Sequence, residues 1–343
     1  MAKVLVTGAA GQVGCRLVRQ LLQAGYEVRG TILPDDPSGS RLDGVDLDIV
    51  SGNLLDPSFV ESAIDGVDSV AHTANLTGRL RGMSEGEFFN NNVMSTFNVA
   101  RAAGRCADRL ERFVHVGSSS VYPNDSHILA TCYDPVDELH PQRPMGTYPV
   151  SKQVGERIVE GVARLTGLRC SIVRPTGIVS GDGVFARFSV GMVAGVLRTG
   201  QAHPGSSLHM ADGTELWHDL EDAAKDASRP CAISVEEGLP WVYQLVDARD
   251  VAHGIVCALE SPAAVGEAFN LSAPAPIPMT QAAEVISRAT GKALLEWKVP
   301  LRWIFMLSNV KARTLIGYRP KWGLEEMVAD AALLRNGESD GMV

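Results

Sequence analysis

Tyr148 and Lys152 form the residue pair of this sequence that best suits proton transfer. They lie four positions apart, and such positions share one face of an α-helix, so both side chains would point into one cleft. A phenol with a pKa of about 10 is a poor acid or base at neutral pH. A neighbouring ammonium stabilises the phenolate, lowers its pKa and so prepares it for proton transfer. The alternative interpretation of this spacing alone is an ordinary pair on a helix surface.

A serine-rich turn supplies a third polar group. The strand-like run Phe113–Val116 leads into Gly117 and then Ser118, Ser119 and Ser120. A serine hydroxyl can hold a substrate oxygen by a hydrogen bond while a proton moves and a nicotinamide gives or takes hydride. The sequence therefore predicts a catalytic set of Ser118, Tyr148 and Lys152.

Three glycines near the N-terminus predict a phosphate-binding turn. Gly8, Gly11 and Gly14 follow the apolar run Val4–Val6 and open a helical pattern. Glycines at this place permit a tight turn, a close approach of a pyrophosphate and close packing of helix on strand, and the helix N-terminus favours anions. The alternative is an ordinary strand–helix turn. The cofactor contacts expected from this segment are Gly8, Ala10, Gly11, Gln12 and Val13.

The end of the second predicted strand bears on the choice between NAD and NADP. An acid there would bind the ribose 2′-hydroxyl of NAD, and an arginine nearby would accommodate the 2′-phosphate of NADP. The strand ends on Ile32 and Leu33, so neither residue type is in its usual place. Asp35 and Asp36 follow closely, whereas the first basic residue is Arg41. We expect Leu33 to contact the cofactor. The two acids favour NAD, and NADP is the alternative.

The elements that must position these residues alternate between strand and helix over the first 175 residues. Short apolar runs of this kind indicate parallel strands buried on both faces and joined by helices. The predicted strands are Lys3–Val6, Glu27–Ile32, Val67–His72, Phe113–Val116 and Leu168–Val173, and clear helical patterns are Val13–Gln23 and Phe88–Ala103. The predicted fold class is α/β, a doubly wound parallel sheet of the Rossmann type with a smaller C-terminal α/β substrate lobe.

The C-terminal part has a different character. We expect a dinucleotide-binding domain over residues 1–175 and a mostly substrate-binding lobe over 176–343, interleaved with the edge of the sheet. Residues 200–240 read as irregular, with several glycines and prolines. Strands are then predicted at Trp241–Val246 and Ala268–Leu271, and helices at Ala248–Leu259 and Thr280–Thr290.

Composition narrows the possible partners. The formal net charge is −9 and no run of lysine or arginine is present, which argues against a nucleic-acid partner. No apolar stretch reaches the roughly 18 residues that span a bilayer, and a strand pattern begins directly after Met1, which leaves no room for a signal peptide. The six scattered cysteines suit a reducing cytoplasm. A loop with His203, His209, Asp212, His218 and Asp219 fits no ligand spacing, so no metal is expected.

The motifs together resemble those of the extended short-chain dehydrogenase/reductases, also called the NAD-dependent epimerase/dehydratase family. The resemblance covers about residues 3–330. Besides the glycine turn and the Tyr148–Lys152 pair, the matching segments are 52–56, 71–74, 92–99, 118–122, 174–177, 246–252 and 266–270.

The resemblance implies roles for individual residues. Tyr148 would be the proton donor or acceptor, Lys152 would bind the nicotinamide ribose and tune Tyr148, and Ser118 would hold the substrate. Ser120 falls on a second polar position that faces substrate. Other positions that the resemblance places beside the cofactor are Asn53, Leu54, Thr73, Ala74, Pro175 and Thr176. A homodimer is also implied.

Departures from the pattern bear on the substrate. Sugar-nucleotide enzymes of this family commonly carry an Arg-Asp pair where this chain has Tyr243 and Gln244, and a diphosphate without a fixed arginine is poorly held. The dehydratases place two acids after the catalytic residue, where Ser119 and Ser120 stand here. We therefore expect redox interconversion of an alcohol and a carbonyl on a small substrate without a nucleotide, and poor binding of UDP- or dTDP-sugars.

Two alternatives stay open. One is an epimerase or dehydratase acting on nucleotide-linked or free sugars, and a lesser one is a protein that binds NAD(P) without turnover. Arg79 and Arg81 follow the fourth strand of the resemblance and are candidates for an anionic group on the substrate, although solvated loop charges are the alternative. Arg143 and Arg187 are weaker candidates of the same kind. His72 and His115 are expected to be hydrogen-bonded histidines of the core.

Overall fold

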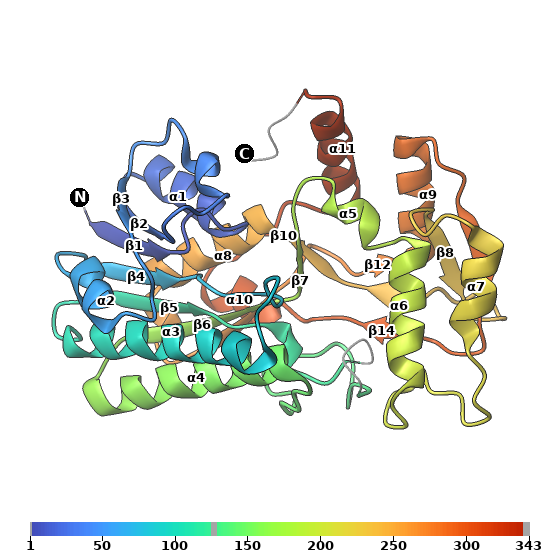
Figure 1. The fold of residues 1–343 in the computed structure, drawn as a ribbon, viewed down its shortest axis with the longest axis horizontal. Coiled ribbons are helices and arrows are strands. Elements are labelled where there is room, and N and C mark those ends of the chain that lie inside the picture. Colours follow the sequence, from blue (N-terminus) through green and yellow to red (C-terminus); the bar gives the residue numbers. More distant parts are fainter. Residues whose placement is uncertain (1, 125–128, 339–343) are drawn as a thin grey trace.

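A seven-stranded parallel sheet organises the N-terminal part of the molecule (Figure 1). The computed structural model describes residues 2–124 and 129–338. The strand order is β3-β2-β1-β4-β5-β6-β11, so the direction of strand addition reverses between β1 and β4. The strands are β1 (Lys3–Thr7), β2 (Glu27–Ile32), β3 (Asp48–Ser51), β4 (Ser69–His72), β5 (Arg112–Val116), β6 (Cys170–Pro175) and β11 (Ala268–Leu271). The doubly wound fold predicted from the sequence is confirmed.

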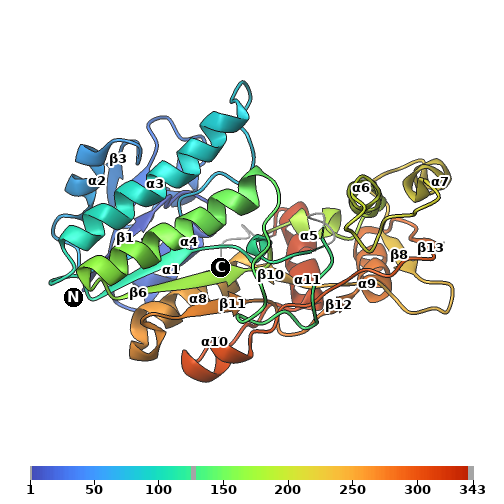
Figure 2. The same cartoon turned by 90° about the horizontal axis from the view of Figure 1, so that it is seen from below.

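Helices cover both faces of this sheet (Figure 2). On one face lie α2 (Pro57–Ile64), α3 (Glu85–Arg105) and α4 (Thr147–Thr166). On the other lie α1 (Gly14–Gln23), α8 (Ala248–Glu260) and α10 (Val310–Leu315). Strand residues alternate between the two cores: Leu5 packs with the first group of helices, whereas Val4 and Val6 pack with the second. Within the described residues, no helix combines the length and the hydropathy needed to cross a membrane.

A smaller lobe built from the C-terminal part carries its own core, on the right in Figure 1. Its helices are α5 (Gly183–Ala186), α6 (Val190–Gln201), α7 (Leu216–Ala224), α9 (Met279–Thr290) and α11 (Leu324–Arg335). Its short strands are β7 (Gly177–Val179), β8 (Cys231–Ser234), β9 (Val242–Tyr243), β10 (Leu245–Asp247), β12 (Ile277–Pro278), β13 (Leu295–Lys298) and β14 (Ile304–Phe305). Single 3₁₀ turns lie at Gly39–Leu42, Ser119–Val121 and Pro262–Ala264.

The chain crosses between the two parts more than once. β11 pairs in parallel with β6, and α8 and α10 pack on the large sheet, although all three follow residue 175 in sequence. β10 pairs with β7 in a separate two-stranded sheet. The C-terminal segment therefore contributes both the edge of the large sheet and the small lobe.

Three sequence expectations differ from the observed elements. The run Trp241–Val246 is divided at Gln244, because β9 pairs with β12 and β14 whereas β10 pairs with β7. The segment 200–240, expected to be irregular, contains α7 and β8. β3 was not among the predicted strands because this edge strand is largely exposed and carries polar residues at both ends, so it lacks an apolar run.

Candidate functional site

A cleft of about 510 Å³ opens at the carboxyl ends of the large sheet. The segments that directly follow β1, β2, β3, β4, β5 and β6 each contribute to its wall. This is the edge at which open parallel sheets bind their ligands. The predicted site residues that line it are Gly8, Gly11, Gln12, Val13, Leu33, Asn53, Leu54, Thr73, Ala74, Ser118, Ser120, Tyr148, Lys152, Pro175 and Thr176.

The glycine turn is packed so closely that side chains would not fit. Gly8 has a φ of +66°, and a Cβ added there would lie 2.9 Å from the Cα of Ala74. A Cβ on Gly14 would lie 2.2 Å from the carbonyl oxygen of Gly8. The turn therefore presents bare backbone and the N-terminus of α1 to the cleft, which suits a pyrophosphate. Ala10 is fully buried and does not line the cleft.

Tyr148 lies in the first turn of α4 and reaches the cleft beside Ser118. Burial raises the pKa of the Tyr148 phenol, and its hydrogen bond with the Ser118 hydroxyl opposes this rise. The Ser118 oxygen also accepts a hydrogen bond from the backbone N–H of Ser120, at 3.1 Å. The serine hydroxyl is thus fixed between the 3₁₀ turn after β5 and the tyrosine.

Lys152 follows one helical turn later and is 4% exposed. Its Nζ donates to the carbonyl oxygen of Val116 at 2.6 Å and to Oδ1 of Asn75 at 3.4 Å. Burial lowers the pKa of Lys152 to about 8, while the charge of Glu156 acts to raise it. Asn75 was missed at the sequence level, although it directly follows the expected cofactor residues Thr73 and Ala74.

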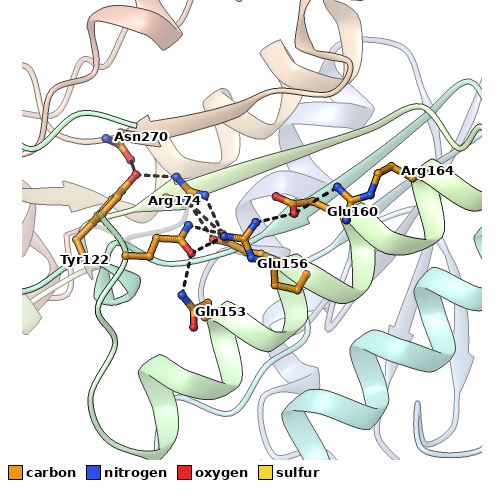
Figure 3. A network of polar contacts seen from close by, with 9 residues as sticks. Tyr122, Gln153, Glu156, Glu160, Arg164, Arg174 and Asn270 are labelled. Atoms are coloured by element: carbon orange, nitrogen blue, oxygen red, sulfur yellow. Dashed lines mark hydrogen bonds and ion pairs between the residues drawn. The ribbon is translucent and has the colours of Figure 1, made fainter. Parts of the chain in front are cut away.

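A buried ion pair lies behind this set (Figure 3). Nε of Arg174 donates to Oε1 of Glu156 at 3.0 Å, and Nη2 donates to Oε2 at 2.8 Å. Nη1 of Arg174 donates to the hydroxyl of Tyr122 at 2.7 Å, and that hydroxyl donates to Oδ1 of Asn270 on β11 at 3.0 Å. The network ties α4 to β6 and to the edge strand. Arg174 stood out in the sequence as part of a motif, but its partner Glu156 did not.

One side of the cleft receives residues from the small lobe. Arg187, Tyr243 and Phe305 line it together with Ser120. The Ser120 hydroxyl is buried and has no hydrogen-bond partner within the part of the chain that the structure describes. Arg187 is half-buried, and within the described residues its one hydrogen bond is a long one, 3.4 Å, to the carbonyl of Ile178. The cleft therefore offers a hydroxyl and a guanidinium beside two aromatic rings.

The arginines expected to be the main anion anchors lie elsewhere. Arg79 and Arg81 are exposed and do not line the cleft, and Arg143 is likewise exposed outside it. The loop that carries Arg79 and Arg81 reaches the cleft only as far as Thr77. Arg187, ranked lower at the sequence level, is the arginine that lines it.

The histidines that the structure describes belong to no cluster of three metal-ligating side chains. His72 is buried between the hydroxyls of Thr7 and Thr96, and burial lowers its pKa to about 3. His115 stacks on His72, but neither of its ring nitrogens has a partner among the described residues. His209 and His218 bond separately to Gln201 and Glu215. No group of three metal-ligating side chains was found among residues 2–124 and 129–338.

Comparison with known proteins gives this site a context. Residues 4–272 match the model of a family described as the NAD dependent epimerase/dehydratase family. A 3 beta-hydroxysteroid dehydrogenase/Delta 5-->4-isomerase of Mycobacterium tuberculosis is 31% identical over 190 residues, which cover 52% of this chain and 47% of that protein. Cinnamoyl-CoA reductase 1 of Petunia hybrida is 29% identical over 232 residues, covering 64% of this chain and 66% of the relative.

A solved structure extends the likeness over the whole chain. It is a short-chain dehydrogenase/reductase superfamily protein from Agrobacterium tumefaciens with bound NAD, with a TM-score of 0.78 and 26% identity. The match covers 98% of this chain and 97% of the other. By contrast, this chain spans about half the length of the first curated relatives that it matches.

Proposed function

The chain belongs to the NAD dependent epimerase/dehydratase family, and we propose that it is an NAD(P)-dependent oxidoreductase that interconverts an alcohol and a carbonyl. The observation that carries this proposal is one cleft lined by Ser118, Tyr148, Lys152 and the glycine turn. The curated relatives named as a dehydrogenase and a reductase support redox chemistry. In this proposal residues 1–175 bind the cofactor, and most of 176–343 shapes the substrate side.

The residues divide the chemistry between them. When bound, a nicotinamide cofactor accepts hydride from the alcohol carbon or gives it to the carbonyl carbon. Ser118 holds the substrate oxygen, and Tyr148 takes the hydroxyl proton during oxidation or returns it during reduction. The buried ammonium of Lys152 lowers the free energy of the phenolate that forms on Tyr148. The backbone of the glycine turn, Gly8 to Gly14, binds the cofactor phosphates.

We propose a small substrate without a nucleotide, either uncharged or singly anionic. Tyr243 lines the cleft where the sugar-nucleotide enzymes of this family commonly have arginine. Gln244 is buried and bonds to Ser272 and to the backbone of Leu307, so it serves the small lobe rather than a ligand. Arg187 is the arginine available for one anionic group, in place of Arg79 and Arg81.

We propose NAD as the preferred cofactor. Asp36 lines the cleft next to Leu33, where a 2′-phosphate would meet its negative charge. Arg41, the expected phosphate ligand of an NADP enzyme, donates to the carbonyl of Ala10 at 3.1 Å. On the family resemblance we also propose a cytoplasmic homodimer. Sedimentation of a single species with the mass of the monomer would contradict the dimer.

The proton-transfer role of Tyr148 is tested by Tyr148→Phe. Removing the phenol oxygen should lower kcat by about 10²–10⁴, because no neighbouring group replaces its proton, while NAD binding stays nearly unchanged. The measurement is cofactor absorbance during turnover of a panel of alcohols, aldehydes and sugar acids. Tyr26→Phe is the matched control, since Tyr26 bonds to Glu260 outside the cleft. Normal turnover by Tyr148→Phe would reject the assignment.

Binding titrations of the wild type with NAD and with NADP test the choice of cofactor. NAD should bind more tightly to the wild type, and Asp36→Asn should narrow the difference because it removes the repelling charge. NADP binding at least tenfold tighter than NAD, about 1.4 kcal/mol, would overturn the preference and leave the catalytic set untouched.

A further inference from the structure

A second cavity, of about 310 Å³, lies outside the catalytic cleft between α1 and α8. The loop between α10 and α11 forms its third wall. Its lining residues are Arg16, Arg19, Gln20 and Gln23 of α1, Arg249, Asp250 and His253 of α8, and Arg319, Lys321 and Trp322 of the loop. The α1 residues recur at spacings of three and four, so they form one continuous face of that helix.

Five of these side chains carry a fixed positive charge, in a chain whose formal net charge is −9. Arg249 is already compensated: it pairs with Asp247 at 2.8 Å and with Asp330 at 3.0 Å. Arg19, Arg319 and Lys321 form no ion pair within residues 2–124 and 129–338; the arginines donate to backbone carbonyls instead. The positive charge of the cavity therefore exceeds what its own acids balance.

Asp250, the acid in the cavity wall, is engaged by the backbone. Its two oxygens accept the N–H groups of Lys321 and Trp322 at 2.9 and 3.0 Å. Burial raises the pKa of Asp250 to about 6. This carboxylate fixes the loop against α8, and it accepts no hydrogen bond from the side chain of Arg319 or of Lys321.

The pKa of the His253 imidazole is affected by the same positive charges. Burial lowers its pKa, and the charges of Lys321 and Arg319 lower it further, although Glu260 acts in the opposite direction. The cavity is open to solvent on one side, where Arg319 and Lys321 are exposed. Like charges gathered around it repel, and a bound anion of complementary size removes that repulsion. Guanidinium groups also bind phosphate and carboxylate oxygens with directed hydrogen bonds.

We propose that the cavity between α1 and α8 is a binding site for a small anion that carries two or more negative charges. Its chemistry is shared by phosphates and polycarboxylates. The site lies beside the cofactor turn, since Nη1 of Arg16 donates to the carbonyl of Gln12 at 2.8 Å, and Gln12 lines the catalytic cleft. It uses none of the residues that we place in catalysis.

Calorimetry tests this site with pyrophosphate and citrate as probes, each titrated into the full-length protein saturated with NAD in a phosphate-free buffer. The expected result is binding of at least one probe at micromolar to submillimolar concentration. Lys321→Glu should weaken it at least tenfold, about 1.4 kcal/mol. Within residues 2–124 and 129–338 the side chain of Lys321 makes no hydrogen bond or ion pair, so this change replaces its positive charge without removing a side-chain contact there. Lys298→Glu, on the exposed face of the small lobe, is the matched control and should bind as the wild type does.

Arg319→Gln provides a second variant that deletes a charge without reversing it, and it should weaken binding as well. Binding of pyrophosphate alone identifies a phosphate site, and binding of citrate alone identifies a polycarboxylate site. The absence of heat for both probes at 1 mM, on the order of −4 kcal/mol, would overturn the proposal. Equal affinity of the wild type and Lys321→Glu would overturn it too, because the anion would then bind elsewhere on the protein.

Discussion

Lys152, a member of the proposed catalytic set, shows how burial changes the pKa of a single ionisable group. Its amine is enclosed by the carbonyl of Val116 and the side chain of Asn75, and its pKa is lowered to about 8. The charged form is therefore held at a free-energy cost that the surrounding acceptors only partly offset. A phenolate forming on Tyr148 would supply the missing counter-charge, so the site is arranged for the state in which the tyrosine has lost its proton.

The low pKa of Lys152 predicts how stability depends on pH. The folded pKa of about 8 lies below the ordinary 10.5, so between these values the unfolded chain binds more protons than the native state. The free energy of unfolding should then rise with pH across this window. Relative to Lys152→Met, the wild type should gain about 2 kcal/mol between pH 7 and pH 9.5.

Urea unfolding of both proteins over that pH range measures the difference. Lys298→Met, which alters an exposed lysine, should show no comparable slope. A difference between wild type and Lys152→Met that stays flat or falls with pH would show that Lys152 titrates normally in the folded protein.

At the scale of elements, α4 places three functional groups along one face. Tyr148, Lys152 and Glu156 follow at intervals of four, and Arg174 on β6 donates three hydrogen bonds to the last of them. Both members of this ion pair are almost fully enclosed, with side chains 6% and 0% exposed. The helix is therefore fixed to the sheet one turn below Lys152, which limits how far the lysine can shift from the cofactor position.

Breaking this ion pair should be costly. Glu156→Gln leaves Arg174 buried with an uncompensated charge, which we expect to destabilise the protein by about 3–5 kcal/mol. Arg174→Met added to Glu156→Gln also removes the unpaired positive charge, so the double variant should recover part of that loss. Glu221→Gln is the control, because its ion pair with Arg198 is exposed and should contribute only about 0–1 kcal/mol. If Glu156→Gln lowered the free energy of unfolding by less than Glu221→Gln does, a structural role of the network would be contradicted.

For the molecule as a whole, the catalytic cleft lies where the small lobe meets the large sheet. Tyr243 of β9 and Arg187, which follows α5, line the cleft from the small lobe, together with the loops that carry Ser118 and Ser120. The small lobe has a separate hydrophobic core that contains Trp241, Trp303 and Phe305. The packing of the small lobe therefore determines which of its side chains line the cleft, whereas the sheet positions the glycine turn and the loops after its strands.

This division predicts weak binding of nucleotide-linked sugars. Tyr243 cannot replace the charge of an arginine on a diphosphate, and Arg187 offers only one guanidinium. Calorimetry with UDP, dTDP and UDP-sugars in the presence of NAD should show no micromolar binding, which would correspond to about −8 kcal/mol. Micromolar affinity for any of them would favour an epimerase or dehydratase acting on such sugars.

The glycine turn, the Tyr148–Lys152 pair and the doubly wound sheet could be predicted from the amino-acid sequence alone. Gly8, Gly11 and Gly14 lie between a strand and a helix, and Tyr148 and Lys152 lie on one helical face. Such signals are local, because a turn or a helix brings residues together within a few positions of the chain. The alternation of apolar strands with helices likewise predicted the doubly wound sheet, since strands buried on both faces must be apolar throughout.

The contacts between distant segments could be seen only in the folded molecule. It paired β11 with β6, brought Arg174 to Glu156, placed Arg187 rather than Arg79 and Arg81 in the cleft, and assembled the cationic cavity from α1, α8 and the loop before α11. These contacts join residues far apart in the chain, and they depend on how each element packs on its neighbours. No periodicity within a short stretch of sequence records that packing, which is why the substrate side and the second cavity became visible only in the folded molecule.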